Sequence, residues 1–577
     1  MTDWPVERTA RRAAGRTDGV LSDINFGEVF PFVTKPLARD GLARYIGPML
    51  GGQVAGLSRH DPLVHDLNPI AFVAGRPYMD LSTYINIPGI AYQLHVLEAV
   101  DRTKGKAIAD LVRAGRLHPL PISLGAHIKL HLAYARMGLR LQWWLFRLRT
   151  PTELRDAYAR TTARLRELVR RPLDKDSPSV LLADLTREFD DESDPTTDGL
   201  QHLGLAMFLH TVLHRLLTKR VPPGLLDDLS KGIPHNPTTM ISLDLWALAQ
   251  DARPLADLFE KTPPDQLVDR LKATEEGRCW WKRFEEFLAR HGHRGEVELD
   301  ITTPRWREDP TFLLQSVTNY LRHPSGTPTP PDMMAEGMRR REAAAAAIRA
   351  GLPFPLRSLF QWLYERYILW LPFREAMKYT WLLGLEQARR VYRELGRRLS
   401  IAGHLKTADD VFWLRLQEVH AWAESGAVTW TATMIASRER EWREWTALRP
   451  PSLIVGSSDI EDSTVLTVPL PGSRLLRGTP VSAGYAEGVA RVITDPHHAD
   501  LRPGEILVTR YTDPAWTPLF FTAGALITEV GGVLSHGAVV AREIGLPAIV
   551  GVEDATTRIT SGRRVKVNAV DGTVELL

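Results

Sequence analysis

A serine–histidine pair near the C-terminus has the surroundings of a site that carries an anion. An apolar run from Ala525 to Val530 ends at Gly531-Gly532, and Ser535-His536 open a segment that Gly545 and Pro547 close. Serine is a preferred helix N-cap, whereas glycine and proline end helices, so the pattern predicts a strand, a turn and a helix beginning near His536. Backbone N–H groups in a first helical turn lack intrahelical partners and lie at the positive end of the helix dipole. A phosphoryl group on the histidine ring would find hydrogen-bond donors there.

A histidine that merely belongs to a strand-to-helix turn is the alternative interpretation, because lone histidines are common. The wider segment from Gly531 to Gly551 favours the interpretation that the histidine carries an anion. It resembles the phosphohistidine, or swivelling, domain of the phosphoenolpyruvate-utilising enzymes, with Gly-Gly, two residues, Ser-His, small apolar residues, and then Ala541-Arg542-Glu543-Ile544-Gly545-Leu546-Pro547-Ala548. The resemblance implies that His536 is transiently phosphorylated and that Ser535 belongs to the same catalytic motif.

Two cationic residues four positions apart, Arg374 and Lys378, form a second candidate site. On a helix they share one face, so both side chains can contact the same anion. Arginine suits bidentate contact with phosphate and lysine adds a point charge, and phosphoryl transfer depends on such positioning and charge. A solvated helix face is the alternative for this pair.

Ionisable residues cluster after a predicted helix from Phe284 to Arg290. His293 and Arg294 lie between two glycines, and Glu298 and Asp300 follow closely. Such a cluster can polarise or deprotonate an acceptor hydroxyl, while a buried ion network that ties the turn to the core is the alternative. No metal site is predicted, because the histidines of this segment lack partner ligands at helical spacing.

Aromatic side chains gather just before Arg374, and Trp370 is the one that we assign to substrate binding. The set consists of Trp362, Tyr364, Tyr367, Trp370 and Phe373. Aromatic residues line pockets for bulky apolar ligands, but at helical spacing they also build ordinary cores.

The elements that must position these residues divide the chain into a helical part and a β-rich part. Apolar residues recur at three- and four-residue spacing over Leu154 to Val169 and Leu200 to Leu217, which predicts amphipathic helices. After a Pro-, Gly- and Ser-rich segment at about 450–475, short β-branched runs alternate with turns. We therefore predict an arm at 1–20, a mainly α-helical domain at 21–450, a linker at 451–475 and an α/β swivelling domain at 476–577.

Composition excludes several classes of protein. Apolar residues make up 44% and charged residues 24% of the 577 residues, as in globular proteins, and the net charge of +3 is not gathered into a nucleic-acid-binding patch. Charged residues interrupt the most apolar stretches before the ~18 apolar residues that a membrane span requires. With a single cysteine and no signal-peptide pattern, we expect a cytoplasmic protein with neither nucleic acid nor membrane as partner.

The helical part also resembles a known domain. Four motifs occur in the order found in the substrate-binding domain of rifampicin phosphotransferase-like proteins: Asn25-Phe26-Gly27-Glu28, Gly292-His293-Arg294-Gly295 with Glu298 and Asp300, Arg374-Glu375-Ala376-Met377-Lys378, and Asp409-Asp410-Val411-Phe412. The resemblance implies that Arg374 and Lys378 lie where the phosphohistidine delivers its phosphoryl group.

The family works as a relay, in which an ATP-grasp domain phosphorylates the histidine and the swivelling domain carries the phosphoryl group to an acceptor. An ATP-grasp module needs on the order of 200 to 300 residues, but only about 20 residues precede the substrate-binding motifs, and no Gly-rich phosphate loop is present. We therefore expect ATP, with Mg²⁺, to be bound by a separate ATP-grasp protein.

These observations give one leading hypothesis and two alternatives. The leading hypothesis is the acceptor-and-carrier component of a split ATP-dependent phosphotransferase, whose acceptor is a small molecule, either an antibiotic or a biosynthetic intermediate. The first alternative is a non-catalytic relative that binds a small molecule. The second is a phosphorelay subunit whose acceptor is a protein.

Overall fold

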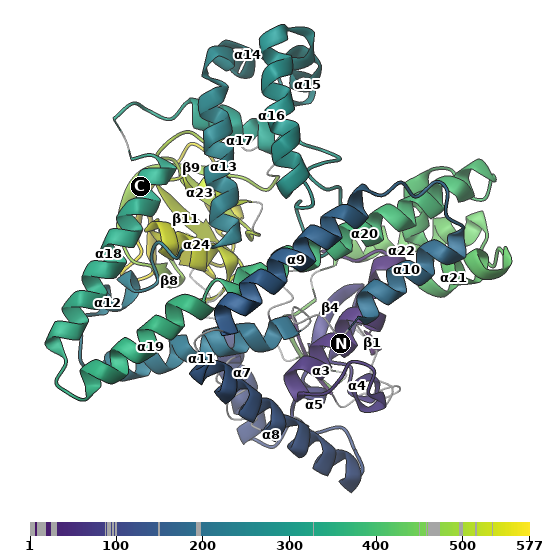
Figure 1. Ribbon diagram of the computed structural model, residues 1–577, viewed down its shortest axis with the longest axis horizontal. Coiled ribbons are helices and arrows are strands. Elements are labelled where there is room, and N and C mark those ends of the chain that lie inside the picture. The colour runs from purple at the N-terminus through teal and green to yellow at the C-terminus, as the bar shows by residue number, and fades with distance from the viewer. Residues whose placement is uncertain are drawn as a thin grey trace. The chain divides into compact units, whose positions relative to one another are not determined.

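A computed structural model describes residues 6–8, 19–24, 30, 32–86, 88, 94, 97–98, 101–147, 150–191, 198–326, 328–448, 450–456, 458–459, 474–495, 500–513, 516–533 and 535–577. The chain groups into two compact units (Figure 1). Unit 1 comprises Met1–Leu205, Leu299–Thr303 and Thr380–Leu466; unit 2 comprises Ala206–Glu298, Pro304–Tyr379 and Thr467–Leu577.

The C-terminal part of unit 2 is built on an eight-stranded mixed sheet with the order β7-β14-β13-β9-β10-β11-β12-β8. Strands β9, β10, β11 and β12 are parallel to one another. At one edge β8 is antiparallel to β12, and at the other β13, β14 and β7 follow β9 in antiparallel order. The strands are β7 Leu475–Arg477, β8 Thr479–Ser482, β9 Tyr485–Val492, β10 Ile506–Thr509, β11 Ala525–Thr528, β12 Ala548–Val550, β13 Arg564–Asn568 and β14 Thr573–Leu576.

Three short helices accompany this sheet: α23 (Thr517–Phe520), α24 (His536–Ile544) and α25 (Ala555–Arg558). Helix α24 packs on β8 and β12 on one side and on α18 on the other. Strands β10, β11 and β12 are buried throughout, as expected for parallel strands covered on both faces. The β-branched runs predicted from the sequence are therefore strands, and the helix predicted after Ser535 is α24.

The rest of unit 2 is helical. Its helices include α12 Pro223–Asp228, α13 Pro237–Asp251, η4 Arg253–Leu255, α14 Ala256–Lys261, α15 Pro264–Ala273, α16 Glu275–His291, α17 Thr311–Leu321, α18 Pro330–Gly351 and α19 Leu356–Trp370. The core contains stacked aromatic rings from α16, where Trp280 and Phe284 lie 5.2 Å apart and Phe284 and Phe287 6.2 Å apart. Helices α11 (Gly199–Leu217) and α20 (Phe373–Ile401) continue from one unit into the other.

Unit 1 combines helices with a six-stranded antiparallel sheet of order β1-β3-β4-β2-β5-β6. Its strands are β1 Val6–Arg8, β2 Val20–Ser22, β3 Ile70–Val73, β4 Arg76–Asp80, β5 Leu453–Val455 and β6 Ser458–Asp459. Its helices include α2 Pro36–Gly41, η2 Leu42–Ile46, α3 Gly47–Ala55, α4 Pro62–Asp66, α5 Leu81–Tyr84, α7 Arg102–Arg113, α8 Leu124–Phe146, α9 Thr150–Arg170, α10 Pro178–Asp190, η5 Ala408–Trp413, α21 Leu416–Ser425 and α22 Ala432–Ala447.

A mainly helical body followed by a C-terminal α/β domain is confirmed, but the sheet of unit 1 is a correction. Strands β3 and β4 lie inside the region predicted as helical, and β5, in the predicted linker, pairs with β2. Val6–Arg8, in the predicted arm, pairs with β3. The motif Asn25-Phe26-Gly27-Glu28 lies outside the described residues. Within the described part of the chain, no helix has the length and apolar character that crossing a membrane demands.

Candidate functional site

Helix α24 presents His536 as its first residue, as the sequence predicted. Ser535 is the N-cap, and its Oγ accepts a hydrogen bond from the backbone N–H of Ala538 at 3.3 Å. The helix ends at Gly545 in the left-handed conformation, with φ of +75°, which glycine adopts at little cost. The cap therefore fixes where the helix begins and places the histidine in its first turn.

The His536 imidazole has different neighbours at its two nitrogens. Nε2 lies 3.1 Å from Thr517 Oγ1, within hydrogen-bonding distance, and Nδ1 lies 4.0 Å from Glu375 Oε2. The ring of Phe520 lies against the imidazole, with centroids 6.5 Å apart. Only 8% of the histidine side chain is exposed. The ring is thus shielded from water, with a carboxylate on one nitrogen and a hydroxyl on the other.

Glu375, on the first turn of α20, is a site residue that the sequence analysis quoted within a motif but did not assign. It is buried, and its Oε2 accepts a hydrogen bond from Thr238 Oγ1 at 3.0 Å. Its position between Arg374 and Lys378, in a motif shared with phosphotransferase-like proteins, was the signal that could have identified it. The hydroxyl of Thr238 holds this carboxylate beside the imidazole.

Lys378 lies one turn farther along α20 and is paired with Glu298. Its Nζ is 2.8 Å from Glu298 Oε2, and the guanidinium of Arg294 donates to the other carboxylate oxygen. Arg294 also lies over the ring of Tyr379 at 5.8 Å, and the ring of His293 meets the same tyrosine edge-on at 4.6 Å. The structure therefore brings four of the predicted residues together, with Glu298 bridging two cations.

The other predicted residues are placed differently. The Arg374 side chain lies outside the described residues, although its backbone is in the first turn of α20. Asp300 belongs to unit 1, where its carboxylate accepts hydrogen bonds from the Thr302 amide and hydroxyl at 2.8 and 2.9 Å. Trp370 is buried, with its ring 5.4 Å from that of Phe373. The catalytic role of Arg374 and the roles of Asp300 and Trp370 in substrate binding stay predictions. Among the described residues, no group of three or more His, Cys, Asp or Glu side chains is arranged to hold a metal ion.

Unit 1 contains a cavity of about 360 Å³ with a largely apolar wall. Its size lies in the range typical of small-molecule sites. Two ion pairs contribute to its lining, Arg140 with Asp198 at 3.1 Å and Arg164 with Glu188 at 2.7 Å. The apolar lining residues include Phe30, Leu42, Ile46, Met49, Leu57, Leu165, Phe189, Leu299, Trp381 and Leu385. The sequence analysis assigned none of these residues to substrate binding.

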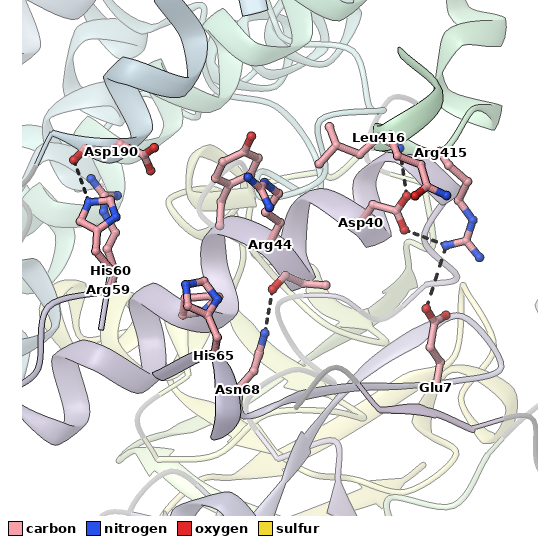
Figure 2. A pocket seen from close by; sticks show the side chains of 14 residues that line it. Glu7, Asp40, Arg44, Arg59, His60, His65, Asn68, Asp190, Arg415 and Leu416 are labelled. Carbon is pink, nitrogen blue, oxygen red and sulfur yellow. Dashed lines mark hydrogen bonds and ion pairs between the residues drawn. The ribbon is translucent and has the colours of Figure 1, made fainter. Parts of the chain in front are cut away.

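A second cavity of unit 1, of about 720 Å³, is lined mainly by polar side chains (Figure 2). Figure 2 shows Asp40 between Arg415 and Leu416, accepting hydrogen bonds from the guanidinium at 2.7 Å and from the leucine N–H at 2.9 Å. Tyr45 and Arg59 line both cavities. The apolar and polar spaces therefore share part of their wall.

Two family models match this chain. Residues 199–375 match the rifampicin phosphotransferase fourth domain, and residues 501–572 match the mobile domain of PEP-utilising enzymes. The first segment contains Thr238, Arg294, Glu298 and Glu375, and the second contains Thr517 and His536. The two matches therefore cover both sides of the histidine site.

Curated relatives extend the similarity. Rifampicin phosphotransferase of Streptomyces sviceus is 33% identical over 61% of this chain and 41% of its own length, and that of Bacillus subtilis is 32% identical over the same shares. The prodigiosin synthesizing transferase PigC of Serratia marcescens is 30% identical over 86% of this chain and 57% of its own length. The chain thus spans about half the length of the curated relatives that it matches.

Among solved structures, the holo form of aconitase X from Thermococcus kodakaraensis is 22% identical over 18% of this chain and 99% of its own, with a TM-score of 0.16. That score is too low to support a structural comparison. The domain matches and the curated relatives confirm the resemblance seen in the sequence: residues 199–375 are similar to the rifampicin phosphotransferase fourth domain, and residues 501–572 to the mobile domain of the phosphoenolpyruvate-utilising enzymes.

Proposed function

We propose that this chain is the acceptor-and-carrier component of an ATP-dependent phosphotransferase, and that His536 carries the phosphoryl group. The observation that supports this most directly is the environment of the imidazole. It lies at a helix N-terminus, with Glu375 Oε2 4.0 Å from Nδ1 and Thr517 Oγ1 3.1 Å from Nε2. A ring with a carboxylate at one nitrogen and a hydroxyl at the other has a defined nucleophilic atom.

In this proposal Nε2 is the nucleophile. In the docked arrangement the Glu375 carboxylate favours the tautomer with its proton on Nδ1, so Nε2 is the ring nitrogen that carries the phosphoryl group to the acceptor. When Nε2 attacks the β-phosphorus of ATP, an Nε2–P bond forms as the bond from that phosphorus to the AMP oxygen breaks. Water then removes the terminal phosphoryl group as inorganic phosphate, and a single phosphoryl group stays on Nε2. The Thr517 hydroxyl, freed from Nε2, can then donate to a phosphoryl oxygen.

Delivery to the acceptor breaks the bond between phosphorus and the imidazole ring. An acceptor hydroxyl attacks the phosphorus and releases its proton to solvent water, the Nε2–P bond breaks, and the electron pair returns to an imidazole that keeps its proton on Nδ1. Lys378 is the cation proposed to offset the negative charge on the transferring group, together with Arg374. Because both oxygens of Glu298 already face cations, we propose that this carboxylate positions Lys378 rather than removing the acceptor's proton.

The cavity of about 360 Å³ in unit 1 is the proposed acceptor site. Its apolar wall suits a ring-containing organic molecule, and the polar cavity that shares Tyr45 and Arg59 suits a hydrogen-bonding extension of that molecule. The names of the relatives include an antibiotic in one case and the synthesis of prodigiosin in the other. An antibiotic and a biosynthetic intermediate are therefore both retained as acceptor classes.

The donor site is proposed to lie on a separate ATP-grasp protein, which would bind ATP with Mg²⁺. The reaction would then yield AMP, inorganic phosphate and the phosphorylated acceptor. The direct test incubates this chain with an ATP-grasp protein encoded beside its gene and with ATP labelled at the β- or γ-phosphate. We expect acid-labile β-label on wild-type protein and none on His536→Ala.

Each other outcome has a definite meaning. Equal labelling of wild type and His536→Ala would refute the assignment of the carrier. Labelling of this chain without the ATP-grasp protein would refute the split arrangement but keep His536. Transfer of label to a protein instead of a small molecule would identify a phosphorelay, and ligand binding with no labelling would identify a binding protein.

A further inference from the structure

The last turn of α24 carries a carboxylate that is held by a different part of unit 2. Glu543 is 3% exposed. Its Oε1 and Oε2 accept hydrogen bonds from Asn236 Nδ2 at 2.9 and 2.7 Å, and Oε2 also accepts one from Thr239 Oγ1 at 3.0 Å. The two asparagine contacts join residues 307 positions apart in the chain. Hydrogen bonds to a buried charged group are stronger than neutral ones.

The orientation of the Asn236 amide is fixed by a second task. Asn236 is the N-cap of α13, and its Oδ1 accepts a hydrogen bond from the Thr238 N–H at 3.0 Å. The amide nitrogen must therefore point the other way, where it can only donate. A carboxylate, which only accepts, is the matching group at position 543.

The backbone at the end of α24 is also held. The carbonyl of Glu543 accepts a hydrogen bond from the Gly232 N–H at 3.2 Å. A Cβ on Gly337 would lie 3.1 Å from that same carbonyl oxygen and 3.0 Å from the Gly232 nitrogen, so this close approach favours glycine in α18. Arg341, one turn farther on α18, donates to the carbonyl of Gly232. We call Gly232, Asn236, Thr239 and Gly337 the Glu543 socket.

We propose that Glu543 and its socket form a docking latch. The latch holds the predicted swivelling domain, residues 476–577, which we call the carrier domain, so that His536 lies beside Glu375. Both residues lie on one nine-residue helix, with His536 at its start and Glu543 in its last turn. Fixing the end of α24 therefore fixes the direction in which its first residue points. Glu543 is a positioning residue. The statement that the docked state is the one that delivers the phosphoryl group rests on the proposed function; the docking itself does not.

Release of the latch exposes His536 for loading. In the docked state the imidazole is 8% exposed, so a nucleotide-bearing partner cannot reach it. A carrier that alternates between two sites needs an attachment that is specific yet reversible. Apolar side chains of α13, α16 and α17 share one buried cluster with the C-terminal domain. The hydrogen bonds to the Glu543 carboxylate add a specific contact to this packing that can be exchanged for bonds to water.

The test exchanges the hydrogen-bonding groups at positions 543 and 236. Glu543→Gln places an amide N–H₂ against the donors of the socket. Asn236→Asp keeps an N-cap of equal quality but sets a second carboxylate against Glu543. In the double variant the glutamine can donate to the new aspartate, so a donor–acceptor pair is restored. Glu575→Gln, an exposed carboxylate on β14 of the same domain, is the matched control.

Docking is read from the rate at which diethyl pyrocarbonate modifies His536 in the full-length chain, measured by peptide mass spectrometry with exposed His118 as internal reference. Loss of one charge-assisted hydrogen bond is expected to raise this rate by about tenfold in each single variant. The double variant should return toward wild type, and Glu575→Gln should match wild type. Unchanged rates in both single variants, or a double variant as reactive as the singles, would overturn the latch.

The modification experiment uses no partner and no acceptor, so it stands apart from the proposed function. With an ATP-grasp partner, the latch further predicts that Glu543→Gln is loaded at least as fast as wild type but delivers more slowly. If the single variants react faster, the double variant returns toward wild type, and neither wild type nor any variant is ever labelled, the proposed function fails and the latch remains.

Discussion

At the residue scale, Glu296 is placed to make unit 2 sensitive to pH. Burial, and then the nearby carboxylates of Asp513, Asp495 and Asp309, raise the pKa of Glu296 from 4.5 to about 8. In the unfolded chain this group ionises near its ordinary pKa, so the folded protein binds the extra proton between pH 4.5 and about 8. The free energy of unfolding should therefore fall as pH rises through this window and level off above it.

Glu296→Gln should remove this part of the pH dependence, because the amide resembles the protonated acid at every pH. We expect variant and wild type to have similar melting temperatures at pH 4.5 and the variant to melt higher at pH 9. Thermal unfolding at the two pH values, with Glu575→Gln as an exposed control, checks this. Parallel profiles for variant and wild type would contradict the assignment.

Glu375 supports a second prediction at this scale. Glu375→Gln keeps a group that can bond to Thr238 but removes the charge that favours a proton on Nδ1 of His536. We expect single-turnover delivery to slow by at least about tenfold, within the range that positioned acid–base groups contribute, while loading, which takes place with His536 released from Glu375, should keep its rate. Thr238→Val, which leaves the charge in place, should have a smaller effect. Equal delivery rates for Glu375→Gln and wild type would exclude a catalytic role for the carboxylate.

At the scale of elements, two substitutions of Ser535 at the beginning of α24 distinguish its effect as a helix cap from the effect of charge beside His536. Ser535→Ala removes the cap and should lower the free energy of unfolding by about 1 kcal/mol. Ser535→Asp keeps a capping oxygen, so stability should be retained, but it sets a negative charge beside His536 and should impair phosphorylation of the ring. Urea unfolding and β-label incorporation measure the two effects. If Ser535→Asp is labelled as fully as wild type, the residue acts only as a cap.

The elements also show why sequence patterns predicted some parts and missed others. Helix α24 was predictable because its cap, its terminating glycine and its apolar face are all local signals. Strands β3 and β4 were missed because they are only four and five residues long and their turn is Ala74-Gly75. Both turn residues have positive φ, and an alanine in that conformation gives no recognisable turn signal.

At the scale of the whole chain, the site could not be predicted because its parts are far apart in sequence. The motifs identified His536 and Lys378, but the contact of His536 with Glu375 and that of Glu543 with Asn236 depend on tertiary structure. Unit 2 gathers three separate stretches around these contacts. The predicted boundary at 451–475 follows composition, which reports local chain character and not such distant contacts.

The proposed acceptor cavity of unit 1 gives the last prediction. Gly384 lines it from α20, and a Cβ built on this residue meets no atom within 4 Å. Gly384→Leu should therefore place the base of its side chain in open space at the cavity wall, and it should stabilise the helix by up to about 1 kcal/mol because glycine disfavours helix interiors. We expect the variant to lose binding of an apolar fluorescent probe, anilinonaphthalene sulfonate, while its melting temperature stays equal or rises.

Gly138→Leu is the matched control, because Gly138 also lies inside a helix of unit 1 with open space at its Cβ but does not line the cavity. It should gain the same helix stability and keep probe binding. Titration of the probe against both variants and wild type, with thermal unfolding alongside, distinguishes filling from unfolding. If Gly384→Leu binds the probe as wild type does, the probe lies elsewhere and the cavity loses its claim as the acceptor site; if both variants lose binding, the effect comes from the helices and not from the cavity.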